Sequence, residues 1–138
     1  MDIQEALFYH LTHTAAVAAL VSTRVYPRIA PQDATLPNLV YWKVSRNQKR
    51  AHNDQPGSGQ KHLVYRRIQI NCTATSPDGA DALAKAVRQA LDSYQGIMGG
   101  SGGLRVYSTF AENVNDGFEF ESNNSAAIVD VMIGYQEV

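Results

Sequence analysis

The stretch HLVYRRIQINCTATSPDGADALAKAVRQALDSYQG, residues 62–96, changes its apolar spacing halfway along. Over 62–74 apolar and polar residues alternate, and one face carries Val64, Ile68, Ile70 and Cys72. A period of two predicts a β-strand with one buried face. The opposite face carries Tyr65, Arg67, Gln69, Asn71 and Thr73, and these residues predict a polar surface on the same strand.

A helix is predicted directly after this strand. Ser76 is a candidate N-cap, and Pro77 stands at the first helical position, where its missing N–H costs nothing. The apolar stripe that follows has helical spacing and consists of Ala80, Leu83, Ala84, Val87, Leu91 and Tyr94. The many alanines predict close contact between helix and sheet. Gly96 is the predicted end of the helix.

Two shorter helices are predicted upstream. Asp2 and Glu5 have the spacing of a capping box before an apolar stripe that reaches Leu11. Thr14 is a candidate cap for a second helix that extends through Val21. Residues 24–26 are predicted to be extended, and the prolines after them favour an irregular segment because proline fixes φ and lacks a donor.

A long β-hairpin is predicted in the middle of the chain. Residues 39–45 alternate, with Val40, Trp42 and Val44 assigned to one face and Tyr41, Lys43 and Ser45 to the other. The segment NQKRAHNDQPGSGQKH, residues 47–62, contains no large apolar residue. Polar connections of this length are usually functional or disordered. We therefore predict a hairpin extension over residues 46–62 that projects beyond the sheet.

The C-terminal part reads as further strands. A flexible connector is predicted over 97–103, followed by strands at 104–111, 117–122 and 127–135. The order of helices and strands predicts an α+β fold in a single domain, residues 1–138. We expect a largely antiparallel β-sheet with helices packed on one face and a long protruding hairpin.

Charge is distributed unevenly along a chain whose net charge is only −1. Seven of the twelve Lys and Arg residues lie between Lys43 and Arg67, and Asp54 is the only acid among them. No Lys or Arg follows Arg105, although six acids do. A chain with one basic and one acidic region favours complementary surfaces that meet.

The composition also bears on compartment and membrane. A lone cysteine, Cys72, excludes an internal disulfide and suits a reducing compartment. The longest apolar run near the N-terminus, residues 15–21, is too short for a signal peptide or a membrane span. We therefore expect no membrane partner and a cytosolic place of synthesis.

Motifs with a catalytic mechanism are not found in the sequence. His10 and His13 lie three residues apart, but no further ligand completes a zinc set. GGSGG at 99–103 lacks the Gly-Lys-Ser/Thr of a phosphate loop and follows a helix rather than a strand. We predict no enzyme activity, no metal and no cofactor. A catalytic set assembled in space from distant residues stays an open alternative.

The remaining candidates are interaction surfaces. A run of charges is often just a solvated loop, whereas clustered Lys and Arg mark phosphate or acidic protein partners. Tyr and Arg are also enriched at protein interfaces. The predicted interface consists of Tyr41, Lys43, Arg46, Lys49, Arg50, Lys61, Tyr65, Arg66, Arg67, Gln69, Glu112, Asp116, Glu119 and Glu121.

Three segments together resemble the tail-completion, or tail-terminator, family of phages and prophages. They are AAVAALVSTRVYPRIAPQDATLPNLVYWKVS (15–45), RIQINCTATSPDGADALAKAVRQALDSYQG (67–96) and AIVDVMIGYQE (127–137). The resemblance covers nearly the whole chain and rests on order and spacing. The sequence departs from the family pattern at Asn38, where an aromatic is commoner, and in the glycines of 99–103.

The resemblance implies a structural virion protein. It implies a homo-oligomeric ring of six subunits at the head-proximal end of a tail, which ends tube polymerisation and joins tail to head. The implied partners are the major tail tube protein and the head–tail connector protein, with DNA only as cargo in the lumen. A protruding hairpin would reach a neighbour, the tube or the lumen.

Two other classes of function fit the residues. A head-side connector or neck protein would have similar size, and a small nucleic-acid-binding module would use the basic hairpin on phosphate. Steep weakening with salt would identify real DNA binding, because phosphate contacts release counterions. Major tail and tape-measure genes next to this gene would identify a tail protein.

Overall fold

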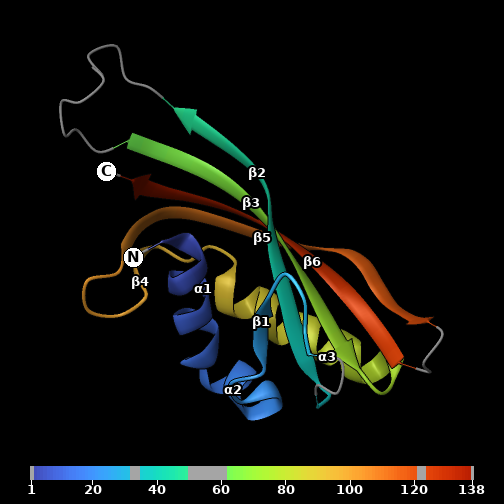
Figure 1. Cartoon of the computed structure of the whole chain (residues 1–138). Coiled ribbons are helices and arrows are strands. Elements are labelled where there is room, and N and C mark those ends of the chain that lie inside the picture. The colour runs from blue at the N-terminus through green and yellow to red at the C-terminus, as the bar shows by residue number, and fades with distance from the viewer. Residues whose placement is uncertain (1, 32–34, 50–61, 121–123, 138) are drawn as a thin grey trace.

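The computed structural model describes residues 2–31, 35–49, 62–120 and 124–137 (Figure 1). Arg50, Lys61 and Glu121 lie outside these ranges, as does most of the predicted hairpin extension. The helices and strands are α1 (Ile3–Thr12), α2 (Ala15–Val21), β1 (Val25–Pro27), β2 (Asn38–Lys49), β3 (His62–Ala74), α3 (Pro77–Leu91), β4 (Gly96–Met98), β5 (Leu104–Phe120) and β6 (Asn124–Glu137).

All six strands form one mixed sheet with the order β1-β2-β3-β6-β5-β4. β1 pairs with β2 in parallel, while the pairs β2–β3, β3–β6, β5–β6 and β4–β5 are antiparallel. The sheet is strongly bent along its strands, so it has the shape of a half-barrel (Figure 1). The prediction of an α+β fold is confirmed as a mixed sheet with three helices, of which the short β1 is the parallel element.

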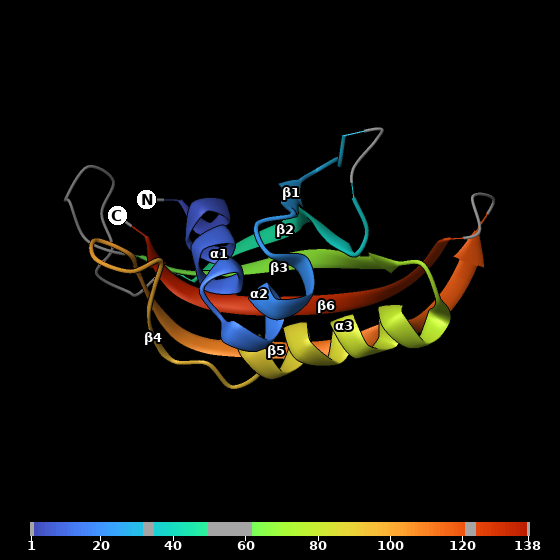
Figure 2. The same cartoon turned by 90° about the horizontal axis from the view of Figure 1, so that it is seen from below.

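The core lies between the sheet and the helices (Figure 2). α3 contacts β3, β5 and β6, while α1 contacts β1, β4 and α2. The alternating face predicted for β3 is buried as expected, since Val64, Ile68, Ile70 and Cys72 are fully inaccessible. Burial raises the pKa of the Cys72 thiol far above its usual value, so the thiol stays protonated and unreactive.

The start of α3 follows the prediction, whereas its end does not. Ser76 Oγ accepts a hydrogen bond from the Gly79 N–H at 3.1 Å, and Pro77 occupies the first turn. The helix ends at Leu91, earlier than predicted. Gly96, with a φ of 131°, opens β4 instead, and β4 pairs with β5. The prediction of a flexible connector over 97–103 is therefore wrong for its first residues.

Both N-terminal helices are present, and they begin differently. Asp2 Oδ1 accepts a hydrogen bond of 2.8 Å from the Glu5 N–H, so the predicted cap of α1 is confirmed. Thr14 occupies the N-cap position of α2 without capping it. Its hydroxyl donates instead to the His10 carbonyl in the last turn of α1, at 2.6 Å.

The prediction for the two faces of β2 is wrong. Leu39 and Tyr41 are buried towards the helices, whereas Val40 and Trp42 are only half-buried on the opposite face. The register explains this, because Tyr41 lies opposite the core residue Ile70. A one-residue difference in register moves every side chain of a strand to the other face.

The two strands predicted at 104–111 and 117–122 are one strand, β5, as far as Phe120. The register between β5 and β6 shifts between Asn113 and Asn115 and again before Phe118. The polar residues over 112–117 are accommodated as β-bulges, which bend a strand without ending it. β6 likewise begins earlier than predicted, at Asn124.

Candidate functional site

The sheet has an outer face, opposite the core, on which none of the described helices packs. It is formed by the residues of β2, β3, β6 and β5 that alternate with the buried ones. Its members are Val40, Trp42, Tyr65, Arg67, Gln69, Asn71, Phe110, Glu112, Ile128, Asp130 and Met132. Phe110 is 67% exposed, which is unusual for a Phe on a sheet that already has a full core.

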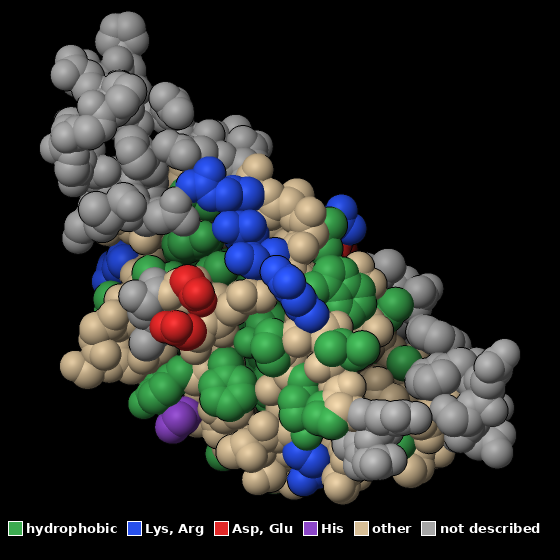
Figure 3. All heavy atoms as spheres, in the orientation of Figure 1, with side chains coloured by type: hydrophobic (Ala, Val, Ile, Leu, Met, Phe, Trp, Pro, Cys, Tyr) green, Lys and Arg blue, Asp and Glu red, His purple; other side chains and the backbone are tan. Residues whose placement is uncertain are grey.

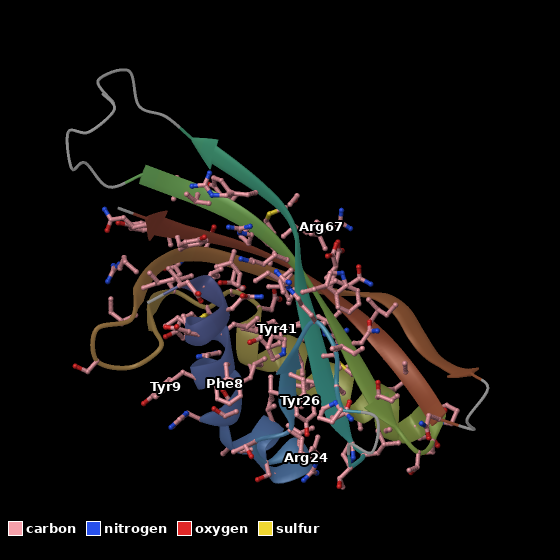
Figure 4. The ribbon with its side chains drawn as sticks, viewed as in Figure 1. Phe8, Tyr9, Arg24, Tyr26, Tyr41 and Arg67 are labelled. Carbon is pink, nitrogen blue, oxygen red and sulfur yellow. The ribbon has the colours of Figure 1, made fainter. Side chains whose placement is uncertain are left out.

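An ion pair joins two strands at the centre of the outer face. Arg67 on β3 donates from Nε to both carboxylate oxygens of Asp130 on β6, at 3.0 and 2.8 Å. Its Nη2 lies 2.8 Å from Asp130 Oδ2 (Figure 4). Hydrogen bonding to Asp130, then the charges of Asp130 and Glu112, raise the pKa of Arg67 further. Asp130 on β6 thus lies between Arg67 of β3, to which it is hydrogen-bonded, and Glu112 of β5, which it faces across the β5–β6 pair.

Tyr65 is held on the same face by a glycine. It pairs with Gly134 of β6, and a Cβ built on that glycine would lie 2.9 Å from the Tyr65 ring. The same Cβ would lie 2.7 Å from Ser108 Oγ. The absence of a side chain at 134 therefore allows Tyr65 to lie against the sheet, and any larger residue would push its ring outwards.

A second feature is a pocket of about 510 Å³ between α1 and β2. Phe8 and Tyr9 come to it from α1 and Tyr41 from β2 (Figure 4). The Tyr41 hydroxyl donates to the Gln4 carbonyl at 3.3 Å, and only 3% of the residue is exposed. The prediction that Tyr41 shares a face with Tyr65 and Arg67 is wrong, because Tyr41 belongs to the core.

The environment of Tyr41 has a measurable consequence. Burial, followed by the charge of Asp2, raises the pKa of Tyr41 above its usual 10.0. The folded protein therefore holds this proton more tightly than the unfolded chain does, and stability falls as the pH rises beyond about 10. We expect Tyr41→Phe to weaken this alkaline loss in urea unfolding at pH 8 and pH 11. Tyr107→Phe, at an exposed position, should leave it unchanged.

Basic side chains form a diagonal band across the view of Figure 3. We define the basic band as Arg28, Lys43, Arg46 and Arg66. The Arg28 N–H donates to the Tyr41 carbonyl at 2.7 Å, which sets Arg28 beside β2. Lys43 is exposed further along β2, and Arg46 lies opposite Arg66 of β3. Arg28 was not among the predicted interface residues, because its place beside β2 depends on the parallel β1–β2 pair.

The structure divides the predicted interface residues into groups. Tyr65, Arg67, Gln69 and Glu112 lie on the outer face, and Lys43, Arg46 and Arg66 belong to the basic band. Lys49 ends β2, while Asp116 and Glu119 lie in the last part of β5. Trp42, Phe110 and Asp130 were missed, although an alternating pattern with apolar residues on both faces is a signal for an uncovered sheet face.

His10 and His13 serve packing. His10 Nε2 lies 2.8 Å from the Ala90 carbonyl of α3, and the His13 ring stacks on Tyr9 with centroids 3.8 Å apart. Among the described residues, no three His, Cys, Asp or Glu side chains are grouped so that they could hold a metal ion. None of the described helices is both long and apolar enough to span a membrane.

Comparison with known proteins points to one family. Residues 5–135 match the family described as "Tail completion protein gp17". A chain of the solved structure "Virion of native gene transfer agent (GTA) particle" shares the fold, with a TM-score of 0.64 and 18% identity. The match covers 99% of this chain and 95% of the other. No curated protein matches at a significant level. Since the family match spans nearly the whole sequence, the chain belongs to the tail completion protein gp17 family.

Proposed function

We propose that the protein forms a closed ring, of six copies, at the head-proximal end of a phage-type tail. There it ends polymerisation of the tube and joins the finished tail to the head. Family membership supports the coarser part of this proposal, a structural role in a phage tail. The fold shared with a chain of a virion particle agrees with that role.

The observation that carries the proposal is the uncovered outer face. An isolated domain gains nothing from leaving Phe110 and Met132 exposed beside Trp42 and Tyr65. Aromatic residues, Met and Arg are the types enriched in protein interfaces. This face is therefore suited to contact with other virion proteins.

Closure into a ring needs two different surfaces on each copy. In a cyclic head-to-tail assembly, one surface of a protomer meets another surface of its neighbour. The basic band lies beside β2, and the acids Glu112, Asp116 and Glu119 lie on β5, towards the opposite side of the sheet. Opposite charges on the two sides favour neighbours that associate in one direction.

The proposed ring assembles in the host cytoplasm and then resides in the virion tail. Its partners are the major tail tube protein on one side and the head–tail connector protein on the other. DNA passes through the lumen as cargo and is not bound by sequence. The protein needs no metal or cofactor for this role.

Electron microscopy of purified tails carrying a labelled protein tests this function. We expect a single ring of label at the head-proximal end of each tail. Unlabelled tails, incubated with the same probe, control for background. Label along the length of the tube, or at the distal tip, would contradict the proposal.

A further inference from the structure

Among the described residues, β2 and β5 each have an outer edge that another strand covers over only part of its length. β1 pairs with residues 39–41 of β2, and the Arg28 N–H donates a hydrogen bond to the Tyr41 carbonyl. From Lys43 to Lys49, no described strand pairs with the outer edge of β2. Strand edges with unpaired backbone groups are templates for pairing with another chain.

β5 is covered over its first part and open over its last. β4 pairs with residues 104–106, and the Ser93 N–H donates to the Thr109 carbonyl at 2.8 Å. The Ala111 N–H donates to Asp92 Oδ1 at 3.1 Å. Within the described part of the chain, nothing pairs with the edge of β5 from Asn113 to Phe120.

We propose that neighbouring copies join by pairing these two open edges, so that β2 residues 43–49 of one copy add to β5 residues 113–120 of the next. The sheet then continues from subunit to subunit around the ring. This inference rests on the proposed function for the ring, and it specifies the contact that closes it.

Strand direction agrees with such a contact. Direction alternates from β2 through β3 and β6 to β5, because all three pairs are antiparallel. Rotation about the ring axis places β2 of the next copy beside β5 of the first copy. The rotation leaves the direction of β2 along the axis unchanged. The new pair is therefore antiparallel as well, and the alternation continues without interruption.

The charges select a register. If Lys43 is set opposite Glu119 of the neighbour, an antiparallel ladder also sets Arg46 opposite Asp116. Both pairs unite opposite charges, which is favourable across strands, whereas like charges directly opposite are destabilising. Lys43 is exposed in the single chain and is therefore accessible to a neighbour.

The displacement between neighbouring copies along the strand direction is close to that of strands in a closed barrel. Within one chain, Asn115 pairs with Ile128, Ile128 with Asn71, and Asn71 with Val40. Asn115 and Val40 therefore lie at the same height along the sheet. In the charge-matched register Asn115 faces Asn47 of the neighbour. Across the bulge in β2, Val40 pairs with Asn71 and Asn47 with Tyr65, so the neighbour is displaced by six ladder positions, roughly 20 Å. Four strands are roughly 19 Å wide, which corresponds to a strand tilt of roughly 46°. Closed barrels have tilts of about 35–45°, so this displacement is near what closure requires.

Disulfide trapping in assembled tails tests the contact. The variant with Lys43→Cys and Glu119→Cys should form, on mild oxidation, covalent multimers up to the size of the closed ring. Each single-cysteine variant should stay monomeric on a denaturing gel, because the contact joins two different surfaces and Cys72 is buried. Lys43→Cys with Arg105→Cys is the matched control, since Arg105 lies on the part of β5 that β4 covers.

The outcomes separate this inference from the proposed function. Tails that carry a head-proximal ring, but show no trapping at 43 and 119, would overturn edge pairing and leave the function standing. Equal trapping of the control pair would also overturn it. Label elsewhere on the tail would contradict the function, while trapping in that assembly would still support edge pairing.

Charge exchange provides a second test that needs no disulfide. Lys43→Glu and Glu119→Lys should each reduce the yield of joined tails, because each places like charges opposite one another. The double variant should restore the yield. If the double variant gave no higher yield of joined tails than the two single variants, the result would count against this register.

Discussion

Replacement of Ile70 by Ala is expected to lower the free energy of unfolding by about 2–5 kcal/mol. Ile70 lies on central strand β3, which is flanked by β2 and β6, and it is fully inaccessible to solvent. Removing three carbons there loses transfer free energy and leaves a cavity that the neighbouring strands cannot fill, because they are fixed in the ladder. For a chain of this length the melting temperature should fall by roughly 10–20 °C.

Urea and thermal unfolding followed by circular dichroism measure this effect. The matched control is Ile29→Ala, the same change at a side chain that is 81% exposed. Its effect should stay within about 0.5 kcal/mol, as for most surface substitutions. Similar losses for the two variants would contradict the core assigned to the inner face of the sheet.

Reversal of Lys49 and Arg50 to Glu is expected to impair ring formation or docking while the single chain stays folded. Exposed ion pairs contribute only about 0.2–1 kcal/mol each. A closed ring repeats every contact, so a change of this size for each of the two charges amounts to about 2–12 kcal/mol over six contacts. Lys49 is the last residue of β2, next to the basic band, whereas Arg50 lies outside the described residues.

The assay is the yield of head-joined tails, with circular dichroism as the test of folding. Lys85→Glu with Arg88→Glu makes the same change of charge on α3, away from the β2 edge. We expect that control to assemble normally. Normal assembly of the Lys49 and Arg50 variant would remove the hairpin from the mechanism, and equal failure of both variants would indicate an effect of net charge alone.

The elements that could be predicted from sequence are those with a local cause. The cap at Ser76 and the stripe of α3 depend on residues within a few positions of each other, as do the cap of α1 and the alternation of β3. The faces of β2 could not be predicted, because Leu39 and Tyr41 compete with Val40 and Trp42, and both sets are apolar. Only packing against the helices decides between them.

For the candidate site, too, the features with a local cause could be predicted and those that depend on strand pairing could not. The polar face of β3 was visible in the alternation of Tyr65, Arg67 and Gln69. Asp130 as the partner of Arg67 depends on the pairing of β3 with β6, which are far apart in the sequence. The turn-like residues within 113–117 predict a break, whereas the structure uses them as bulges in a continuous strand.

The hydrogen bonds of Asp92 and Ser93 to β5 have a consequence for the protein before it meets a tail. A subunit that accumulates in free form is at risk of aggregation through its strand edges. Here half of one edge is covered by the chain itself, and the open parts carry like charges in every copy. Two β2 edges repel each other, as do two β5 edges, so pairing between identical edges of two copies is unfavourable. The cover that Asp92 and Ser93 give to β5, together with the charges of the open edges, would thus reduce edge-to-edge aggregation of the free protein.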